Sequence, residues 1–362
     1  YGWITQWGPT VECLALSAAR PDRLVLGTSG HVFLTDDAGA TWQQRYCRPF
    51  PDGRFAGNGL EVTCFNSVIP DPTDPQRLYF GYMDIGLLIS ADGGASYRAA
   101  HQGMKYQGNC FTVAIDPADP SKLWAGTGEW GSNHGDLCRS ADRGATWTVV
   151  GNPASGLPDG QTRHVVVDPT SPPGRRTLLV TSNRNGVFRS TDDGFTWQPR
   201  NTGLPEMTKV EPRQLLADPR GPRHLLLALA GAPQSGAGLY ETRDQGGAWQ
   251  RVPAHLLGQA TAAGFVADVQ DLVAGPDGFA TLYLCQRERY DGSLQPPVMF
   301  PGGLFRSRDG GQTWERLHDF HFCRTVLVSP ADPQVLYLAT TDHPYHDDSR
   351  ALGVLKSRDG GK

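Results

Sequence analysis

Five loops that follow apolar, strand-like runs are rich in side chains that can bind a ligand or react with it. They lie at residues 81–86, 128–134, 183–185, 286–301 and 341–348. Loops on a rigid scaffold are where binding groups concentrate. The rings of Trp130 and Tyr290 suit a sugar, because a pyranose has an apolar face and polar edges. Arg287 and Glu288 precede Tyr290 in the longest loop, so we include them among the ligand-binding candidates.

The loop at 342–348 contains residue types that also bind cations. Asp342, His343 and His346 lie within five residues of one another. Carboxylate and imidazole groups are ligands for divalent metals, but the spacing here matches no metal-binding template. We therefore predict no metal site and no cofactor, and we take His343 and His346 as ligand-binding candidates.

Three arginines occupy equivalent positions in the chain. Each lies five residues before the Asp-Pro or Ser-Pro pair that ends an apolar run, and the series is Arg163, Arg213 and Arg324, with His164 beside the first. A guanidinium presents a planar fork that fits carboxylates, phosphates or sugar hydroxyls. The alternative is that these residues are polar because they line a wet channel, where Glu12 or Asp271 would pair with them.

A repeated phrase defines the elements that must position these residues. It reads Ser/Thr-x-Asp-x-Gly-x-Thr-Trp, and its aspartates recur every 50 to 65 residues at Asp37, Asp92, Asp142, Asp192, Asp244, Asp309 and Asp359. A period near fifty residues indicates a propeller or a solenoid. Asp, Ser and Gly are turn residues, and the Thr-Trp that follows begins a strand.

The phrase resembles the Asp-box, or BNR repeat, of sialidases, sortilin-type receptors, xyloglucanases and photosystem assembly factors. In those families the box lies between the third and fourth strands of a blade, away from the ligand. Each repeat here reads as four strands, so we predict an all-β, seven-bladed β-propeller with four-stranded antiparallel blades. We expect residues 3–8 to supply the last outer strand and close the ring. Residues 1–362 would then form a single domain.

Composition excludes several classes of function. The net charge of −4 gives no indication of nucleic-acid binding, and no apolar run is long enough to span a bilayer. Seven cysteines cannot all be paired in disulfides. Because proteins with this repeat are mostly exported, the resemblance implies an extracellular or periplasmic location. Flanking domains or a protein partner remain open.

The segment around Asp84 resembles the loop that carries a catalytic Asp in the xyloglucanase family. The resemblance implies that Asp84 is a general acid or base, with Glu129, Glu288 or Asp342 as its partner carboxylate. Xyloglucanases have two propellers that face across a cleft, whereas this chain has repeats for one. The three arginines are similar to those of sialidases, but sialidases have six blades and an Arg-Ile-Pro motif that is absent here.

These observations leave three function classes. The first is a carbohydrate-active propeller, glycoside hydrolase-like, that binds a glycan at the channel mouth. The second is a non-catalytic propeller for glycan binding, protein binding or assembly. The third is a lyase for uronic-acid glycans, which would use a His or Tyr base and arginines to neutralise the carboxylate.

Overall fold

The computed structural model describes residues 11–361, except 18, 29–31, 46, 59–63, 233–234, 254, 257–267, 293–294, 296 and 343–349. The described residues form β-strands, turns and two short 3-10 helices, with no α-helix among them. The chain divides into two compact units. Unit 1 is Tyr1–Ser155 with Asp159–Val165, and unit 2 is Gly156–Pro158 with Val166–Lys362.

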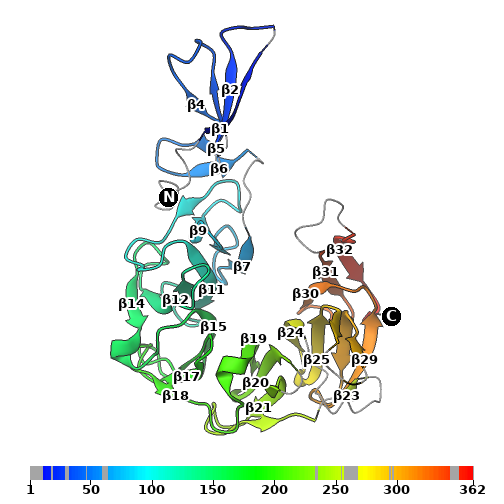
Figure 1. The fold of residues 1–362 in the computed structure, drawn as a ribbon. Helices are drawn as coiled ribbons and strands as arrows, with labels where there is room; N and C mark the ends of the chain where they lie inside the picture. Colours follow the sequence, from blue (N-terminus) through cyan, green and yellow to red (C-terminus); the bar gives the residue numbers. More distant parts are fainter. Residues whose placement is uncertain are drawn as a thin grey trace. The chain divides into compact units, whose positions relative to one another are not determined.

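Unit 1 contains three four-stranded antiparallel sheets, in which consecutive strands pair (Figure 1). The first is β1 (Val11–Leu16), β2 (Leu24–Thr28), β3 (Val32–Thr35) and β4 (Gln43–Gln44). The second is β7 (Phe65–Pro70), β8 (Leu78–Tyr82), β9 (Leu87–Ser90) and β10 (Arg98–Ala99). The third is β11 (Asn109–Ile115), β12 (Leu123–Gly128), β13 (Gly135–Ser140) and β14 (Thr148–Gly151). A hairpin of β5 (Cys47–Pro49) and β6 (Phe55–Gly57) and the helix η1 (Pro153–Ser155) complete the unit.

Unit 2 continues the pattern after β15 (Thr162–Val167), the strand in which the boundary between the units falls. Its sheets contain β16 (Leu178–Ser182), β17 (Gly186–Ser190) and β18 (Gln198–Pro199), then β19 (Val210–Asp218), β20 (Gly221–Gly231), β21 (Gly238–Thr242) and β22 (Gln250–Arg251). They continue with β24 (Val269–Gly275), β25 (Gly278–Gln286), β28 (Gly303–Ser307) and β29 (Thr313–His318), and end with β30 (Cys323–Val328), β31 (Leu336–Thr340) and β32 (Val354–Ser357). Strand β23 (His255–Leu256) joins β29 in parallel, and η2 (Met207–Lys209) precedes β19. Strands β26 (Arg289–Asp291) and β27 (Val298–Phe300) form a separate hairpin.

The predicted all-β class and the four-stranded antiparallel blades are confirmed. In the described part of the chain, five sheets have four strands, the sixth has the same four plus the parallel strand β23, and the last has three. The predicted closing strand at residues 3–8 lies outside the described residues, so ring closure and the single domain stay predictions. No helix among the described residues is long and apolar enough to cross a membrane.

Each Asp-box folds as a self-contained turn, as the box at Ser140–Trp147 illustrates. The Ser140 hydroxyl donates to Asp142 Oδ1 at 2.7 Å and accepts the Gly144 N–H at 2.9 Å. The same carboxylate accepts the N–H and the hydroxyl of Thr146, at 2.9 and 2.6 Å. Arg143 and Gly144 adopt φ of 58° and 85°, the left-handed region that makes the turn tight. The box aspartate is therefore occupied by its own turn.

In two of the boxes the left-handed residue also joins neighbouring sheets. Within unit 1, Arg143 Nη1 lies 2.6 Å from Oδ2 of Asp71, a buried carboxylate at the end of the preceding sheet's first strand. Within unit 2, Gln245 Nε2 donates to Asp168 Oδ2 at 2.6 Å. We call each such contact a box latch. It fixes one end of the sheets, so variation is left to the loops at the other end.

The core lies between successive sheets. In unit 1 it contains Tyr79, Leu87, Leu123 and Trp147, each at most 5% exposed. The Trp147 indole N–H donates to the carbonyl of Ala100 in the preceding sheet at 2.8 Å, which orients the ring. Trp249 makes the same bond to the Arg200 carbonyl in unit 2, also at 2.8 Å. All seven cysteines are free thiols.

Candidate functional site

The candidate residues lie on the connections between the second and third strands of the sheets or, for Arg163, His164, Arg213 and Arg324, near the starts of first strands. Because the third strand ends in the Asp-box, its start and the loop before it lie at the opposite end of the sheet. Segments that lead from an outer strand to the next inner strand reach the same end. We call this end of each sheet the loop end.

Asp84 occupies the β8–β9 turn of unit 1 in a left-handed conformation, with φ of 69°. Its N–H donates to Asn109 Oδ1 at 3.3 Å, and Gly86 N–H donates to the Gly108 carbonyl at 2.8 Å. The backbone of the turn is therefore tied to the start of the next inner strand. The Asp84 carboxylate is exposed and forms no hydrogen bond or ion pair with any described residue, so a ligand can reach it.

The equivalent turn of unit 2 carries Arg184, two residues after the end of β16. Its φ is 63°, and its side chain is exposed. An arginine in this conformation lacks the local hydrogen bonding that makes Asp tolerant of it, and strain of this kind, about 1–2 kcal/mol, clusters at functional sites. The same turn thus presents an anion in one sheet and a cation in another, so turn chemistry alone does not select the side chain.

Glu129 and Trp130 lie on the β12–β13 loop of unit 1, and both are exposed. The Glu129 carboxylate accepts the Ser132 hydroxyl at 3.1 Å. Gln161 braces the loop from the next segment, because its side-chain N–H group donates to the carbonyls of Glu129 and Ser132, each at 2.8 Å. The loop is therefore held by its backbone, and the Trp130 ring, 70% exposed, faces solvent.

A histidine–carboxylate pair lies at the base of this loop. His134 Nδ1 lies 2.5 Å from Asp159 Oδ2, and Asp159 Oδ1 accepts the Gly135 N–H at 3.0 Å. Partial burial opposes ionisation of Asp159, but the bonds from Gly135 and His134 outweigh it and lower the pKa of the carboxyl. The sequence identifies this loop only as residues 128–134, because Asp159 is 25 residues from His134 and their pairing could not be foreseen.

Arg163 and His164 lie on β15, in the first part of the strand, which belongs to unit 1. Arg163 Nη2 donates to Gln161 Oε1 at 2.9 Å, and its guanidinium lies over the Phe111 ring, 5.2 Å from the centroid. Gln161 therefore links Arg163 to the backbone of Glu129. Both Arg163 and His164 have further interactions within the described part of the chain.

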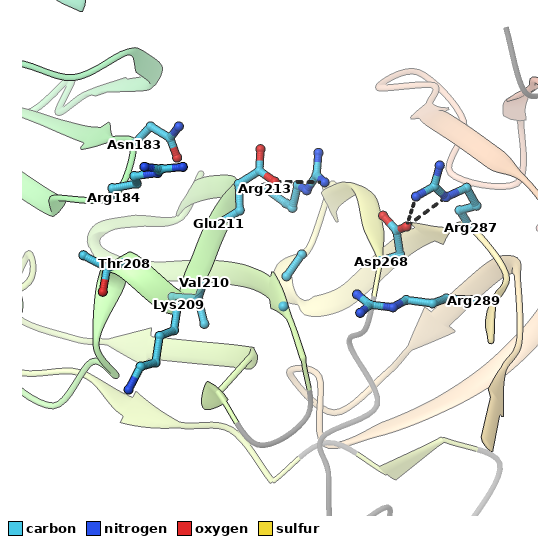
Figure 2. A pocket seen from close by; sticks show the side chains of 12 residues that line it. Asn183, Arg184, Thr208, Lys209, Val210, Glu211, Arg213, Asp268, Arg287 and Arg289 are labelled. Atoms are coloured by element: carbon cyan, nitrogen blue, oxygen red, sulfur yellow. Dashed lines mark hydrogen bonds and ion pairs between the residues drawn. The ribbon is translucent and has the colours of Figure 1, made fainter. Parts of the chain in front are cut away.

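A cavity of about 440 Å³ opens at the loop end of unit 2 (Figure 2). Its volume is within the range of small-molecule sites, roughly 300–1,000 Å³. The lining is mainly polar and consists of Asn183, Arg184, Thr208, Lys209, Val210, Glu211, Arg213, Ala230, Gly231, Asp268, Arg287 and Arg289. Of the sequence-predicted residues, Arg213 and Arg287 meet here. Five cationic side chains face two carboxylates, which makes the cavity electropositive.

Asp268 organises one wall of the cavity. Its carboxylate is almost fully buried and accepts Arg287 Nε at 2.8 Å and Gln270 Nε2 at 2.7 Å. Gln270 Oε1 in turn accepts Arg324 Nη1 at 2.9 Å. The structure therefore connects Arg287 to Arg324, two predicted binding residues, through an aspartate that the sequence interpretation did not single out.

The residue after Gln270, Asp271, has a structural role. Asp271 accepts the Gln214 side chain at 3.1 Å and the Thr325 hydroxyl at 2.6 Å, so it joins the inner strands β19, β24 and β30. Desolvation raises the pKa of Asp271, in spite of these bonds. One alternative from the sequence was that Glu12 or Asp271 pairs with the arginines. In the described structure Asp271 bonds Gln214 and Thr325, while Arg213 pairs with Glu211 at 3.1 Å.

The β26–β27 hairpin separates the remaining candidates of the long loop. Tyr290 pairs with Met299, and both are exposed, whereas Arg289 pairs with the buried Phe300. Paired residues share a face of a hairpin, so Tyr290 lies on the face opposite Arg289. Glu288 is exposed, and its N–H donates to the His321 carbonyl at 2.7 Å.

Asp342 is held by backbone contacts at the end of the β31 segment. Its side chain is 7% exposed, and Oδ2 accepts the Arg350 N–H at 2.7 Å. His321 Nε2 lies 3.7 Å from Oδ1. His343 and His346 lie outside the described residues. Within the described chain, no group of three or more His, Cys, Asp or Glu side chains is placed to hold a metal ion.

Comparison with known proteins gives the repeat and the fold. Residues 305–316 match the model described as the BNR/Asp-box repeat. A probable oligoxyloglucan-reducing end-specific xyloglucanase of Neosartorya fischeri is 28% identical over 86% of this chain and 44% of its own length. A xyloglucanase of Paenibacillus is 24% identical over 58% of this chain and 26% of its own. The chain thus spans less than half the length of these relatives.

Two solved structures support the same fold. The GH74 xyloglucanase from Xanthomonas campestris superposes with a TM-score of 0.58 at 19% identity, over 97% of this chain and 54% of its own. YCF48 bound to a D1 peptide superposes with a TM-score of 0.51 at 17% identity, over 97% of this chain and 94% of its own. Identities this low report on the fold alone. The chain is a β-propeller of the BNR/Asp-box type.

Proposed function

We propose that this chain is a carbohydrate-active propeller that binds an oligosaccharide or polysaccharide through its loop ends. The observation that carries the proposal is the polar cavity of unit 2, lined by guanidinium, amide and hydroxyl groups. Sugar hydroxyls are recognised by groups of these types. The similarity to xyloglucanases, including one over 86% of this chain, supports a glycan as the ligand. It also supports an extracellular or periplasmic location.

The proposal includes glycoside hydrolase-like chemistry at the loop end of unit 1. Asp84 has an exposed carboxylate without a described partner, and Glu129 is exposed on the following sheet's loop. One carboxylic acid would protonate the oxygen of the leaving sugar, and the other carboxylate would deprotonate the attacking water. Water supplies the hydroxyl group of one product. The proton that water loses replaces the proton that the acid gave to the other product.

A non-catalytic propeller is the second candidate. YCF48, whose solved structure is bound to a D1 peptide, superposes over 94% of its own length. A binding module would need the cavity of unit 2 but no pair of carboxylates. The two candidates therefore differ in whether a bound glycan is cut.

The test combines a binding screen with a cleavage assay on the full chain. An array of neutral and acidic plant and bacterial glycans should show binding to at least one glycan class. The bound polymers are then incubated with the protein, and new reducing ends are measured. Binding with release of reducing ends supports the hydrolase, and binding without it supports the non-catalytic module. An unsaturated product absorbing in the ultraviolet would indicate a lyase. Failure to bind any glycan would refute the proposal.

A further inference from the structure

The cavity of unit 2 contains more positive charge than its own carboxylates neutralise. Arg213 is paired with Glu211, and Arg287 is paired with Asp268. Lys209 Nζ lies 2.6 Å from Glu206, which lies just outside the lining. Among the described residues, the guanidinium groups of the two other lining arginines, Arg184 and Arg289, form no ion pair or hydrogen bond.

These two arginines extend into the cavity from opposite sides (Figure 2). Arg184 comes from the β16–β17 turn, and Arg289 comes from the first residue of β26. Between them lie Glu211 and Asp268, each with its own arginine. Two unpartnered cations in one lining make the cavity electropositive, so an anionic ligand would be attracted to it.

The local structure maintains this arrangement. Arg184 is held at φ 63°, where Gly or Asn would fit with less strain. Arg289 is opposite Phe300 in the hairpin, and burial of Phe300, 3% exposed, fixes which face of the hairpin points inward. Asp268 neutralises Arg287, so the unbalanced positive charge of the cavity comes from Arg184 and Arg289.

We propose that the saccharide bound in this cavity is anionic, with carboxylate or sulfate groups bound by Arg184 and by Arg289. This inference rests on the proposed function, because it names the substrate class of the same site. The planar guanidinium can donate two parallel N–H bonds to such a group. Thr208, Asn183 and Lys209 line the same cavity and offer neutral and cationic donors for the rest of the sugar.

The test compares ligands that differ in charge alone. Binding of an oligogalacturonide and of its methyl-esterified form to the full chain is measured by titration calorimetry, with a sulfated oligosaccharide as a further ligand. The charged sugar, whether uronate or sulfate, should bind at least about tenfold more tightly than the neutral ester at low salt, and the difference should shrink as salt is added.

Matched variants locate the effect. The double variant Arg184→Gln/Arg289→Gln should lose about tenfold or more in affinity for the charged sugar and little for the ester. Arg308→Gln is the control, because Arg308 is an exposed arginine in the box at the other end of its sheet. Arg184→Gly with Arg289→Gln gives a second double variant in which the turn is less strained.

The outcomes separate the two proposals. Equal binding of the charged and esterified sugars, independent of both arginines, would overturn the anionic ligand and leave the glycan-binding function intact. An equal loss of affinity in Arg308→Gln would also overturn it. If no saccharide binds but an acidic peptide does, with the same dependence on Arg184 and Arg289, the proposed carbohydrate function itself fails.

Discussion

The Arg287 guanidinium is held by Asp268, with Nε 2.8 Å from the buried carboxylate. Because Asp268 also accepts the side chain of Gln270, this one carboxylate positions residues on both β24 and the segment after β25. The cavity wall therefore depends on a residue that need not touch a ligand.

Asp268→Asn should loosen the wall of the cavity. Asn preserves the shape but removes the negative charge that Arg287 and Gln270 contact, and hydrogen bonds to charged groups contribute about 1.5–3 kcal/mol. We expect the free energy of unfolding, measured in urea, to fall by about 1–3 kcal/mol. The affinity for a bound glycan should decrease as well. Arg243→Gln, at an exposed arginine near a box, should leave both quantities close to wild type.

Asp84 can be tested separately for its charge and for its turn. If the carboxylate takes part in bond cleavage, Asp84→Asn should lower the rate of glycan cleavage by about 10²–10⁴-fold. The Tm should be nearly unchanged, because Asn tolerates a φ of 69°. Asp84→Gly keeps the turn and removes the side chain, so it should be equally inactive. Full activity in both variants would assign Asp84 to the turn alone.

Gly86 is required by a close approach between two segments. A Cβ at Gly86 would lie 2.0 Å from the Gln107 carbonyl oxygen, and φ is +72°. Gly86→Ala should therefore reduce the free energy of unfolding by about 2–4 kcal/mol. Gly131 is the matched control, since its φ is +75° but its Cβ would meet nothing within 4 Å. Gly131→Ala should cost only about 1 kcal/mol, and equal losses in the two variants would contradict the steric explanation.

The box aspartates should make the fold sensitive to acid. Bonds from the Ser96 hydroxyl and N–H lower the pKa of Asp92 from 3.8 to about 2. A folded pKa below the unfolded value means that this stabilisation is complete above about pH 4 and is lost as the pH falls towards 2. Asp92→Asn should therefore have a flatter profile of Tm against pH over that interval. Asp332→Asn, at an exposed aspartate outside the boxes, should keep the slope of the wild type, and an equally steep slope in Asp92→Asn would contradict the prediction.

The repeat made the fold predictable from the sequence, because each box combines turn residues with a core tryptophan at a regular spacing. Strand pairing and the loop end follow from that period alone. The cavity is different. Asp268 follows a segment outside the described residues, and Lys209 and Glu211 lie around a short 3-10 helix, so no repeat aligns them with Arg184 or Arg289. Arg213 could be predicted because it lies at a repeat-defined position, and Arg287 because it lies in the long insertion.

Placement of the catalytic candidates shows the same division. The sequence identified Asp84 and Glu129 as loop residues, and the structure shows both exposed on successive sheets of unit 1. It could not indicate that the Asp342 carboxylate would accept the backbone N–H of Arg350, because that contact joins residues eight positions apart outside any repeat-defined element. It also could not reveal that Tyr290 and Arg289 lie on opposite faces, which follows from the hairpin register.

The box latches imply that neighbouring sheets are matched in pairs. Arg143 contacts Asp71 and Gln245 contacts Asp168, so each of these two boxes binds the turn of the sheet before it through a different side chain. A blade moved to a new place in the chain would meet an unmatched neighbour, even with its box intact. Transplanting a loop end into another propeller of this type would therefore require moving adjacent blades together, or re-matching both latch residues.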